Sequence, residues 1–279
     1  RDDVESRGLG DVYKRQPYAR GPVRSLPLAT AVAQTEQLQR EGYRELVLTG
    51  IEISSWGHDL KNGQSLIDLL EAVSAAAGNM RLRLGSLEPR TITEDFCRRA
   101  AALPHLCPHF HLSLQSGCDA TLKRMNRKYD TARYLESVEL LNRWFDRPAV
   151  TTDLITGFPE ETEEEFAQTL DFIRKCRFAQ MHIFPYSIRP GTPAAKMEQV
   201  SKAVKEERAR RAAAVADDVV RMEVYGHSGH EQRPADIDIG LCEPSGVVVS
   251  GRDVENPASL HQGVERVEDH AHHDDAEGH

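Results

Sequence analysis

The sequence predicts an α/β protein built on a parallel sheet. Apolar runs rich in β-branched residues alternate with helical segments over residues 17–225, at the spacing of βαβ units. Strands that alternate with helices in this way lie parallel, in a flat sheet or in a barrel. The five predicted strands are Glu45–Ser54, Met80–Leu87, His109–Gln115, Val150–Thr156 and Gln180–Tyr186.

The segments between these strands carry recognisable helix boundaries. The first predicted helix is Leu26–Arg40, with Gly42 just beyond it as a stop. Two Thr-x-x-Glu capping boxes, Thr91–Glu94 and Thr162–Glu165, predict where two later helices begin. The other helix signals are the apolar stripe of Tyr134, Val138 and Leu141 and the charged segment Ser201–Glu223.

Small and polar residues follow each predicted strand. They are Thr49-Gly50, Gly85-Ser86, Gln115-Ser116-Gly117, Thr156-Gly157-Phe158-Pro159 and Pro185-Tyr186-Ser187. Parallel α/β folds bind ligands at the carboxyl ends of their strands, and glycine lets a ligand approach the backbone closely. Any one of these positions can be an ordinary turn. Five at the same edge predict a shared ligand site.

Charge separates the body of the chain from its tail. The chain has 35 Lys and Arg against 44 Asp and Glu, a net charge of −9. Residues 226–279 hold 3 Arg, no Lys and 12 acidic residues, so they account for the whole of that charge. We expect this tail to be a solvated appendage, with Gly246–Ser250 as its one apolar run. A metal site at His270, His272 and His273 is the alternative.

Cysteine usage and hydropathy indicate the compartment. The five cysteines are an odd number at wide, irregular spacing, which predicts reduced thiols and a cytoplasmic protein. The same spacing excludes a CxxC-type metal knuckle. The chain has no run of about 18 apolar residues, so no transmembrane helix is predicted. Residues 1–16 lack the apolar region of a secretory signal.

Several long strings occur in a fixed order along residues 17–225. They are PYARGPVRS (Pro17–Ser25), LTGI (Leu48–Ile51), LGSLEP (Leu84–Pro89), HFHLSLQSGCD (His109–Asp119), TDLITGFPEET (Thr152–Thr162) and FPYSIRPGTP (Phe184–Pro193). In this order the strings resemble the radical S-adenosylmethionine methylthiotransferases. The first and third are most similar to the branch that modifies N6-threonylcarbamoyladenosine at position 37 of tRNA.

The resemblance implies a fold and a chemistry. The fold is a partial TIM-like (β/α)6 barrel with its active site inside the carboxyl end. The implied cofactors are S-adenosylmethionine and two [4Fe–4S] clusters, one of them held by a CxxxCxxC loop after the first strand. Reductive cleavage of S-adenosylmethionine gives a 5′-deoxyadenosyl radical that abstracts hydrogen from adenine C2, and the second cluster supplies the sulfur. The implied partners are tRNA and an electron donor such as flavodoxin or ferredoxin.

The sequence departs from this family at both ends. The positions of the three loop cysteines are occupied by Arg7, Asp11 and Lys14, and these side chains cannot replace three thiolates. We therefore expect no metal ligands, no cluster loop and no first strand. The predicted division is a foreign or misassembled segment 1–16, a radical SAM core 17–225, and a tail 226–279 without an RNA-binding barrel. On this reading the chain is inactive as written, although its family is enzymatic.

The resemblance also implies which residues meet S-adenosylmethionine. Gly50 and Ile51 match the edge that faces the methionine moiety, and Ser113 and Gln115 face the interior together with His109 and His111. The edges near adenine contain Gly157, Phe158, Phe184, Pro185 and Tyr186. The glycines can equally be tight turns, and the aromatic residues can equally be core. No catalytic side chain is identified.

Arginine near the start of the core suggests RNA contact. Arg15, Arg20 and Arg24 form a local basic strip with Tyr18, and phosphate contact by Arg20 and Arg24 is one interpretation. Residues 1–225 have zero net charge, which gives no broad electrostatic field for tRNA. Two alternatives stay open. One is a non-catalytic α/β binding module that retains the barrel. The other is an unrelated barrel enzyme using Asp153 and Glu88.

Overall fold

A computed structural model describes residues 23–50, 52–225 and 247–249 of the chain. The described helices and strands follow one another as α3 (Leu28–Arg40), β1 (Glu45–Leu48), α4 (Leu66–Ala76), β2 (Arg81–Leu84), α5 (Glu94–Ala101), β3 (His109–His111), α6 (Asp119–Arg124), α7 (Thr131–Trp144), β4 (Ala149–Thr156), α8 (Glu163–Cys176), β5 (Gln180–Pro185), α9 (Lys202–Tyr225) and β6 (Val247–Val249). Three short 3₁₀ turns, η1 (Ile53–Ser55), η2 (Pro89–Thr91) and η3 (Pro193–Lys196), lie in the connections.

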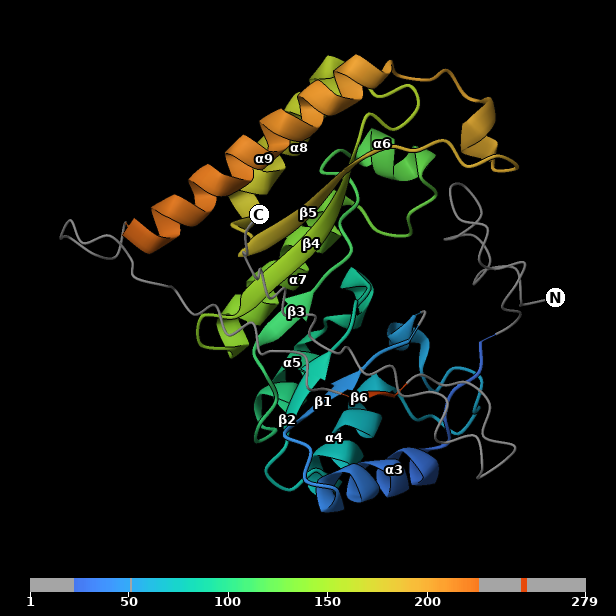
Figure 1. The fold of residues 1–279 in the computed structure, drawn as a ribbon, viewed down its shortest axis with the longest axis vertical. Coiled ribbons are helices and arrows are strands. Elements are labelled where there is room, and N and C mark those ends of the chain that lie inside the picture. Colours follow the sequence, from blue (N-terminus) through green and yellow to red (C-terminus); the bar gives the residue numbers. More distant parts are fainter. Residues whose placement is uncertain (1–22, 51, 226–246, 250–279) are drawn as a thin grey trace, which may run out of the picture.

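All paired strands are parallel. They form two three-stranded sheets, ordered β2–β1–β6 and β3–β4–β5. Single parallel bridges, Leu82 to Leu106 and Leu87 to Leu112, connect β2 with the chain on either side of β3. Strands β1 to β5 therefore lie side by side in chain order, as Figure 1 shows. The predicted α/β class and partial TIM-like barrel are confirmed.

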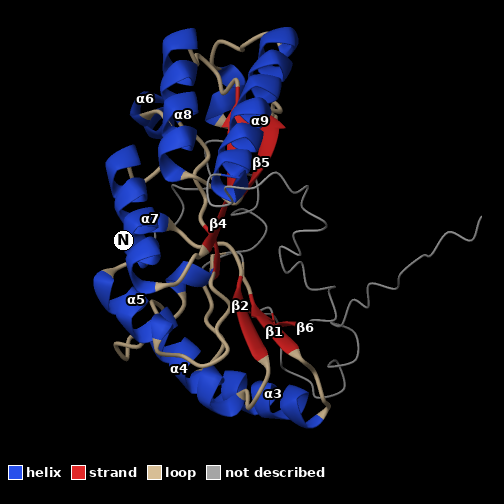
Figure 2. Cartoon of the chain, turned by 90° about the vertical axis from the view of Figure 1, so that its left-hand side faces the viewer, coloured by secondary structure: helices blue, strands red, loops and turns tan. Residues whose placement is uncertain are grey.

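The helices cover one face of this curved layer. Figure 2 shows α4, α5, α7 and α8 stacked along one side of the strands, while the opposite side carries none of these helices. Alternate strand residues point into the helical layer and are buried, among them Leu46, Leu82, Phe110 and Leu154. Burial of this apolar surface is the main favourable contribution to folding. The other strand residues face the uncovered side.

Helix boundaries largely follow the capping signals. In α8 the Thr162 side chain accepts from the Glu165 N–H, which confirms the capping box, and Phe166 and Ile173 are fully buried. Helix α3 ends before Gly42, whose φ of 86° suits glycine. The capping box predicted at Thr91 is wrong. Thr91 ends the turn η2, and Thr93 caps α5 by accepting from the Phe96 N–H at 3.1 Å.

Four predicted strands are longer than the observed ones, although β5 is shorter by one residue only, since it ends at Pro185 rather than Tyr186. Strand β1 ends at Leu48 rather than Ser54, because Ile53–Ser55 forms the turn η1. The side chain of Ile53 is buried, although this residue belongs to the turn and not to the strand. Strand β2 ends at Leu84, before Gly85. Strand β3 covers only His109–His111, although isolated bridges continue at Leu112 and Gln115. Alternating apolar residues mark which face a segment buries and do not fix where its backbone ladder ends.

Strand β6 comes from the acidic tail, where no element was predicted. Val247–Val249 pair in parallel with Leu46–Leu48 of β1 and occupy the edge of the sheet opposite β2. An unpaired edge strand presents free N–H and C=O groups, and a short apolar strand can satisfy them. The other tail residues lie outside the described part of the chain, and so does the proposed histidine metal site at His270, His272 and His273.

Candidate ligand-binding face of the sheet

Side chains that are polar, apart from Phe184, cover the side of the sheet that the helices leave open. We call this the open face and define it by Glu45, Arg81, Arg83, His109, His111, Thr151, Asp153, His182 and Phe184. Their neighbours in the strands are mostly buried leucine, valine and phenylalanine. The two-residue period of a strand places alternate side chains on opposite faces. A sheet with one apolar and one polar face results.

Strands β1 and β2 contribute an ion-pair cluster to the open face. Glu45 lies opposite Arg81 in register, and its carboxylate is 3.2 Å from Arg81 Nη2 and 3.0 Å from Arg83 Nε. The Glu45 side chain is only 11% exposed, so both arginines neutralise a carboxylate that has little water around it. The cluster fixes the orientation of two guanidinium groups at the amino end of this face.

Strands β3, β4 and β5 contribute a histidine network. The ring of His111 lies between Thr151 and Asp153, with Nδ1 3.0 Å from the Thr151 hydroxyl and Nε2 3.4 Å from Asp153 Oδ2. The ring of His182 lies 6.2 Å from that of His111. Both ring nitrogens of His111 have partners, so the ring has a defined orientation on the open face.

His109 has an unused polar atom on this face. Its Nδ1 is buried without a hydrogen-bond partner among the described residues, whereas Nε2 lies 3.4 Å from the Thr151 hydroxyl. Burial lowers the pKa of His109, and the nearby Arg83 and His111 lower it further, against an opposing effect of Glu45. The neutral ring therefore offers one donor and one acceptor. An unsatisfied buried atom of this kind suits a polar ligand at the open face.

The residues that follow β1 and β3 include three of the predicted S-adenosylmethionine contacts, Gly50, Ser113 and Gln115. Gly50 is exposed, and a Cβ atom added to it would have no neighbour closer than 3.8 Å. Ser113 is half-buried and its N–H donates to the Leu87 carbonyl. Gln115 is buried at a φ of 69°, and its backbone bridges β4 by bonds to Asp153 and Ile155. Gln115 therefore turns the chain away from the open face, while Ser113 stays beside it.

The carboxyl ends of β4 and β5 are covered instead. Phe158 is fully buried and packs edge-on against Tyr186 with their ring centroids 5.2 Å apart, in a small apolar cluster with Met125 and Ala194. Gly157 has a φ of 65°, and a Cβ there would be 2.4 Å from Lys205 Cγ. These predicted S-adenosylmethionine contacts are thus built into the core.

The remaining predicted residues divide by exposure. Phe184 is 53% exposed, Pro185 and Arg24 are exposed, and none of the three belongs to that cluster. Ile51 and Arg20 lie outside the described residues. So do the positions expected for cluster cysteines, which are Arg7, Asp11 and Lys14.

The thiols of the described residues do not suit an iron–sulfur cluster. Cys97, Cys118 and Cys176 are buried, and no three His, Cys, Asp or Glu residues of the described part come together as metal ligands. Burial raises the pKa of Cys97 to about 11 and that of Cys176 to about 12. Cysteine binds metals and iron–sulfur clusters as the thiolate, and Cys97 and Cys176 stay protonated at neutral pH.

A family model and a solved structure account for this architecture. The model of the Radical SAM superfamily matches residues 11–173. The chain belongs to the Radical SAM superfamily. Coproporphyrinogen III oxidase (HemN) of Escherichia coli, a radical SAM enzyme, superimposes with a TM-score of 0.51 at 15% identity, over 69% of this chain and 45% of that enzyme. At this identity the superposition shows a shared fold. Members of the superfamily use S-adenosylmethionine and a [4Fe–4S] cluster.

Two kinds of relative within the superfamily match equally well. Threonylcarbamoyladenosine tRNA methylthiotransferase MtaB of Bacillus subtilis is 40% identical over 206 residues, 74% of this chain and 46% of the relative. tRNA-2-methylthio-N(6)-dimethylallyladenosine synthase of Desulforamulus reducens is 40% identical over 195 residues, 70% of this chain and 43% of the relative. The predicted resemblance to tRNA methylthiotransferases is confirmed. The chain spans less than half the length of each of these relatives.

Proposed function

We propose that the chain carries the core of a tRNA methylthiotransferase. The identity of 40% to two kinds of tRNA-modifying relative carries this proposal, and the open face supports it. Most of the longest matching strings belong to strand ends or to the turns after them, where parallel α/β proteins bind their ligands. On this proposal tRNA is the partner and S-adenosylmethionine the cofactor. When bound, the cofactor supplies the radical for attack on the substrate base.

The chain's own residues divide the work of holding S-adenosylmethionine. Gly50 leaves room for a ligand at the end of β1, and His109 of β3 has a buried ring nitrogen without a partner among the described residues. Ser113 follows β3 and is half-buried. Phe158 and Tyr186 act indirectly, because they are core residues that fix the backbone at the ends of β4 and β5. Phe184 and Pro185 are exposed and free to contact the ligand.

The same proposal includes a loss of cluster chemistry in this chain. Arg7, Asp11 and Lys14 stand at a CxxxCxxC spacing without any thiol, and two of them are cationic. Iron is held in these clusters by soft anionic sulfur, so the three side chains do not fit the group. An RNA-binding module without the radical chemistry is therefore the second candidate function, and this substitution is the observation that favours it.

The choice of nucleoside is tested by binding. Anticodon stem-loops carrying N6-threonylcarbamoyladenosine, N6-dimethylallyladenosine or unmodified adenosine at position 37 would be labelled and titrated with the full chain. The proposal predicts tightest binding of the threonylcarbamoyl stem-loop, since the first strings of the sequence resemble that branch. Equal affinity for all three stem-loops would contradict it, because a modification core must recognise the base on which it acts.

A further inference from the structure

A cation-lined hollow lies beside the carboxyl end of β3. It has a volume of about 510 Å³ and is formed between the turn η2, the loop after α6 and the first turn of α7. Its lining residues are Arg90, Arg127, Lys128, Tyr129, Asp130 and Arg133, and we call it the basic hollow. Four of the six carry a positive charge and one carries a negative charge.

Hydrogen bonds attach the basic hollow to the open face. The Tyr129 hydroxyl donates to the carbonyl of Ser113 at 2.5 Å and lies 3.1 Å from that of Leu114, so the loop is fastened to the end of β3. The Arg127 guanidinium lies close enough to Tyr129 and Asp153 for both to act on its charge. A ligand that occupies the hollow therefore adjoins the open face, where Ser113 and Asp153 lie.

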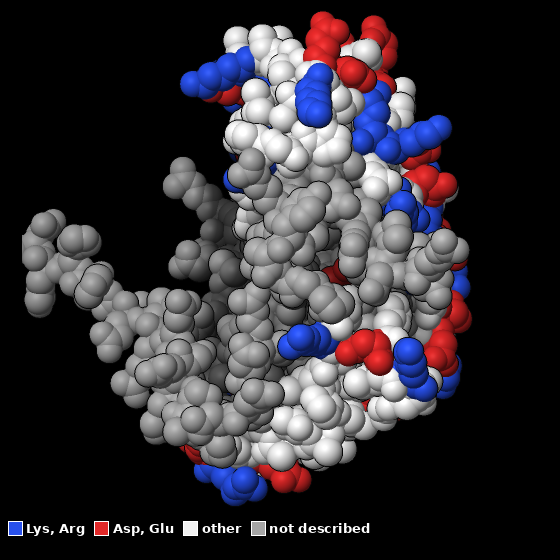
Figure 3. All heavy atoms as spheres, turned by 90° about the vertical axis from the view of Figure 1, so that its right-hand side faces the viewer, with Lys and Arg blue, Asp and Glu red and all other residues white. Residues whose placement is uncertain are grey.

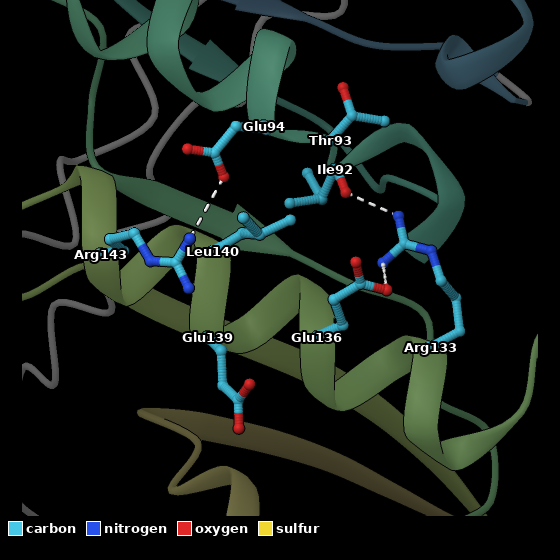
Figure 4. Close-up of a pocket in the computed structure, with 8 residues that line it drawn as sticks. All are labelled: Ile92, Thr93, Glu94, Arg133, Glu136, Glu139, Leu140 and Arg143. Atoms are coloured by element: carbon cyan, nitrogen blue, oxygen red, sulfur yellow. Dashed lines mark hydrogen bonds and ion pairs between the residues drawn. The ribbon is translucent and has the colours of Figure 1, made fainter.

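A second hollow, on the other side of Arg133, provides an internal comparison. It measures about 420 Å³ and is lined by Glu94, Glu136 and Glu139 as well as Arg133 and Arg143. Figure 4 shows Arg143 directed at Glu94 and Arg133 at Glu136, and both ion pairs measure 3.4 Å. Three carboxylates and two guanidinium groups line this acidic hollow, with Glu139 directed away from both arginines in Figure 4, so it has no excess of positive charge.

Charges in the basic hollow are less completely neutralised. Lys128 is exposed and donates to the neutral amide oxygen of Asn126 at 3.2 Å. Arg133 donates to the carbonyl of Ile92 at 2.6 Å. The carboxylate of Asp130 is used as the cap of α7, where it accepts from the Arg133 N–H.

Arg90 has a carboxylate partner, Glu88, to which two of its nitrogens donate at 3.1 and 3.0 Å. The Arg90 side chain is nevertheless 51% exposed. Arg133 also has a carboxylate partner, Glu136, at 3.4 Å. With Glu88 and Glu136 counted beside Asp130, four cationic side chains stand against three carboxylates, which leaves an excess of one positive charge. Elsewhere, the charges are mixed: positive and negative side chains alternate along one rim of the face drawn in Figure 3.

We propose that the basic hollow binds a backbone phosphate of the RNA substrate. Guanidinium and ammonium groups form strong charge-assisted hydrogen bonds with phosphate oxygens, and such contacts position an RNA without reading its sequence. The place of the hollow beside the strand ends would hold the RNA backbone next to the base that enters the open face. This inference rests on the proposed function, because it takes RNA as the ligand.

The test is RNA affinity of matched variants of the full chain. Lys128→Gln and the double variant Lys128→Gln, Arg90→Gln remove charge from exposed positions of the basic hollow. Arg143→Gln removes an exposed arginine from the acidic hollow and serves as the control. Labelled anticodon stem-loops with the three nucleosides described above would be titrated at several salt concentrations, and S-adenosylmethionine affinity would be measured calorimetrically for each variant.

We expect Lys128→Gln to weaken all three stem-loops by the same factor, about three- to tenfold. The slope of log affinity against log salt should fall by about 0.7 to 1 for each phosphate contact removed. Arg143→Gln should leave RNA affinity unchanged. A phosphate contact predicts that the variants lose affinity equally for all three stem-loops. The proposed function is tested separately, by the difference in affinity between stem-loops in the parent chain.

Three results would overturn the inference. In the first, the hollow variants and Arg143→Gln bind RNA alike. In the second, S-adenosylmethionine affinity falls and RNA affinity does not, which would assign the hollow to the carboxylate of that molecule. In the third, the parent chain binds none of the stem-loops. If that chain still bound S-adenosylmethionine, the assignment of the superfamily core would stand and only the RNA inference would fail.

Discussion

Residues Lys205 and Arg208 of helix α9 hydrogen-bond to the chain at the carboxyl ends of β4 and β5, and we call this set of contacts the clamp. At the end of β1, by contrast, Gly50 is exposed. In the clamp, Arg208 Nη1 lies 2.9 Å from both the carboxylate and the carbonyl of Glu161, and their side chains are 5% and 1% exposed. The same carboxylate accepts the Gly157 N–H at 2.8 Å. A second contact joins the Thr156 hydroxyl to the Lys205 carbonyl at 3.1 Å.

The comparison separates two reasons for glycine after a strand. Gly157 needs its left-handed backbone and lies against Lys205, so the architecture requires glycine there. Gly50 has an ordinary backbone and open space where a Cβ would be, so packing gives no reason for glycine. A ligand that approaches the backbone provides one. We infer that the β1 end binds the ligand and that the clamped end supports it.

The largest expected effect is loss of the clamp. Arg208→Ala leaves Glu161 buried and without its ion pair, which typically costs about 3–5 kcal/mol of unfolding free energy. The matched variant Arg210→Ala removes an exposed arginine of the same helix, paired with Glu207, and should cost far less, because the solvent screens a surface ion pair. Urea unfolding measures both. Equal losses would show that the buried pair contributes no more than a surface pair.

The next effect distinguishes two phenylalanines that sequence alone places at the cofactor. Phe158→Ala should lower the free energy of unfolding by about 3 kcal/mol, because Phe158 is fully buried against Tyr186. Phe184→Ala should change it by less than about 0.5 kcal/mol, because Phe184 is 53% exposed. If Phe158→Ala is as stable as the parent chain, the aromatic cluster is not part of the core.

The smallest effect concerns pH at the open face. The pKa of His109 is lowered on folding, so the folded chain binds fewer protons at this residue than the unfolded chain does. Its contribution to stability is complete above the ordinary histidine pKa of about 6.5 and is lost as the pH falls below that value. In His109→Asn the acid loss should be smaller. Unfolding curves across this pH range provide the measurement.

Sequence patterns predict the class of fold well because they depend on period. Alternation in β2 and β4, and the capping box at Thr162, locate elements that the structure contains. The polar face was visible only in part. His109 and His111 alternate with apolar neighbours, but the pairing of Glu45 with Arg83 depends on strand register, which joins residues 38 positions apart.

Other features have no local signal. The Glu161–Arg208 pair and the basic hollow are each made by segments far apart in sequence, so neither could be located before the fold was known. Strand β6 was missed because three valines in an acidic tail are too short a run to indicate a strand. The charge run Arg127-Lys128 next to Tyr129 was the available clue to the basic hollow.

Iron binding tests most directly whether the chain is a methylthiotransferase core that lacks its cluster ligands. After anaerobic reconstitution with iron and sulfide, the parent chain should hold almost none of either. The variant Arg7→Cys, Asp11→Cys, Lys14→Cys restores the CxxxCxxC spacing and should hold about four of each per chain, as a [4Fe–4S] cluster does. A full complement of iron and sulfide in the parent chain would contradict the account.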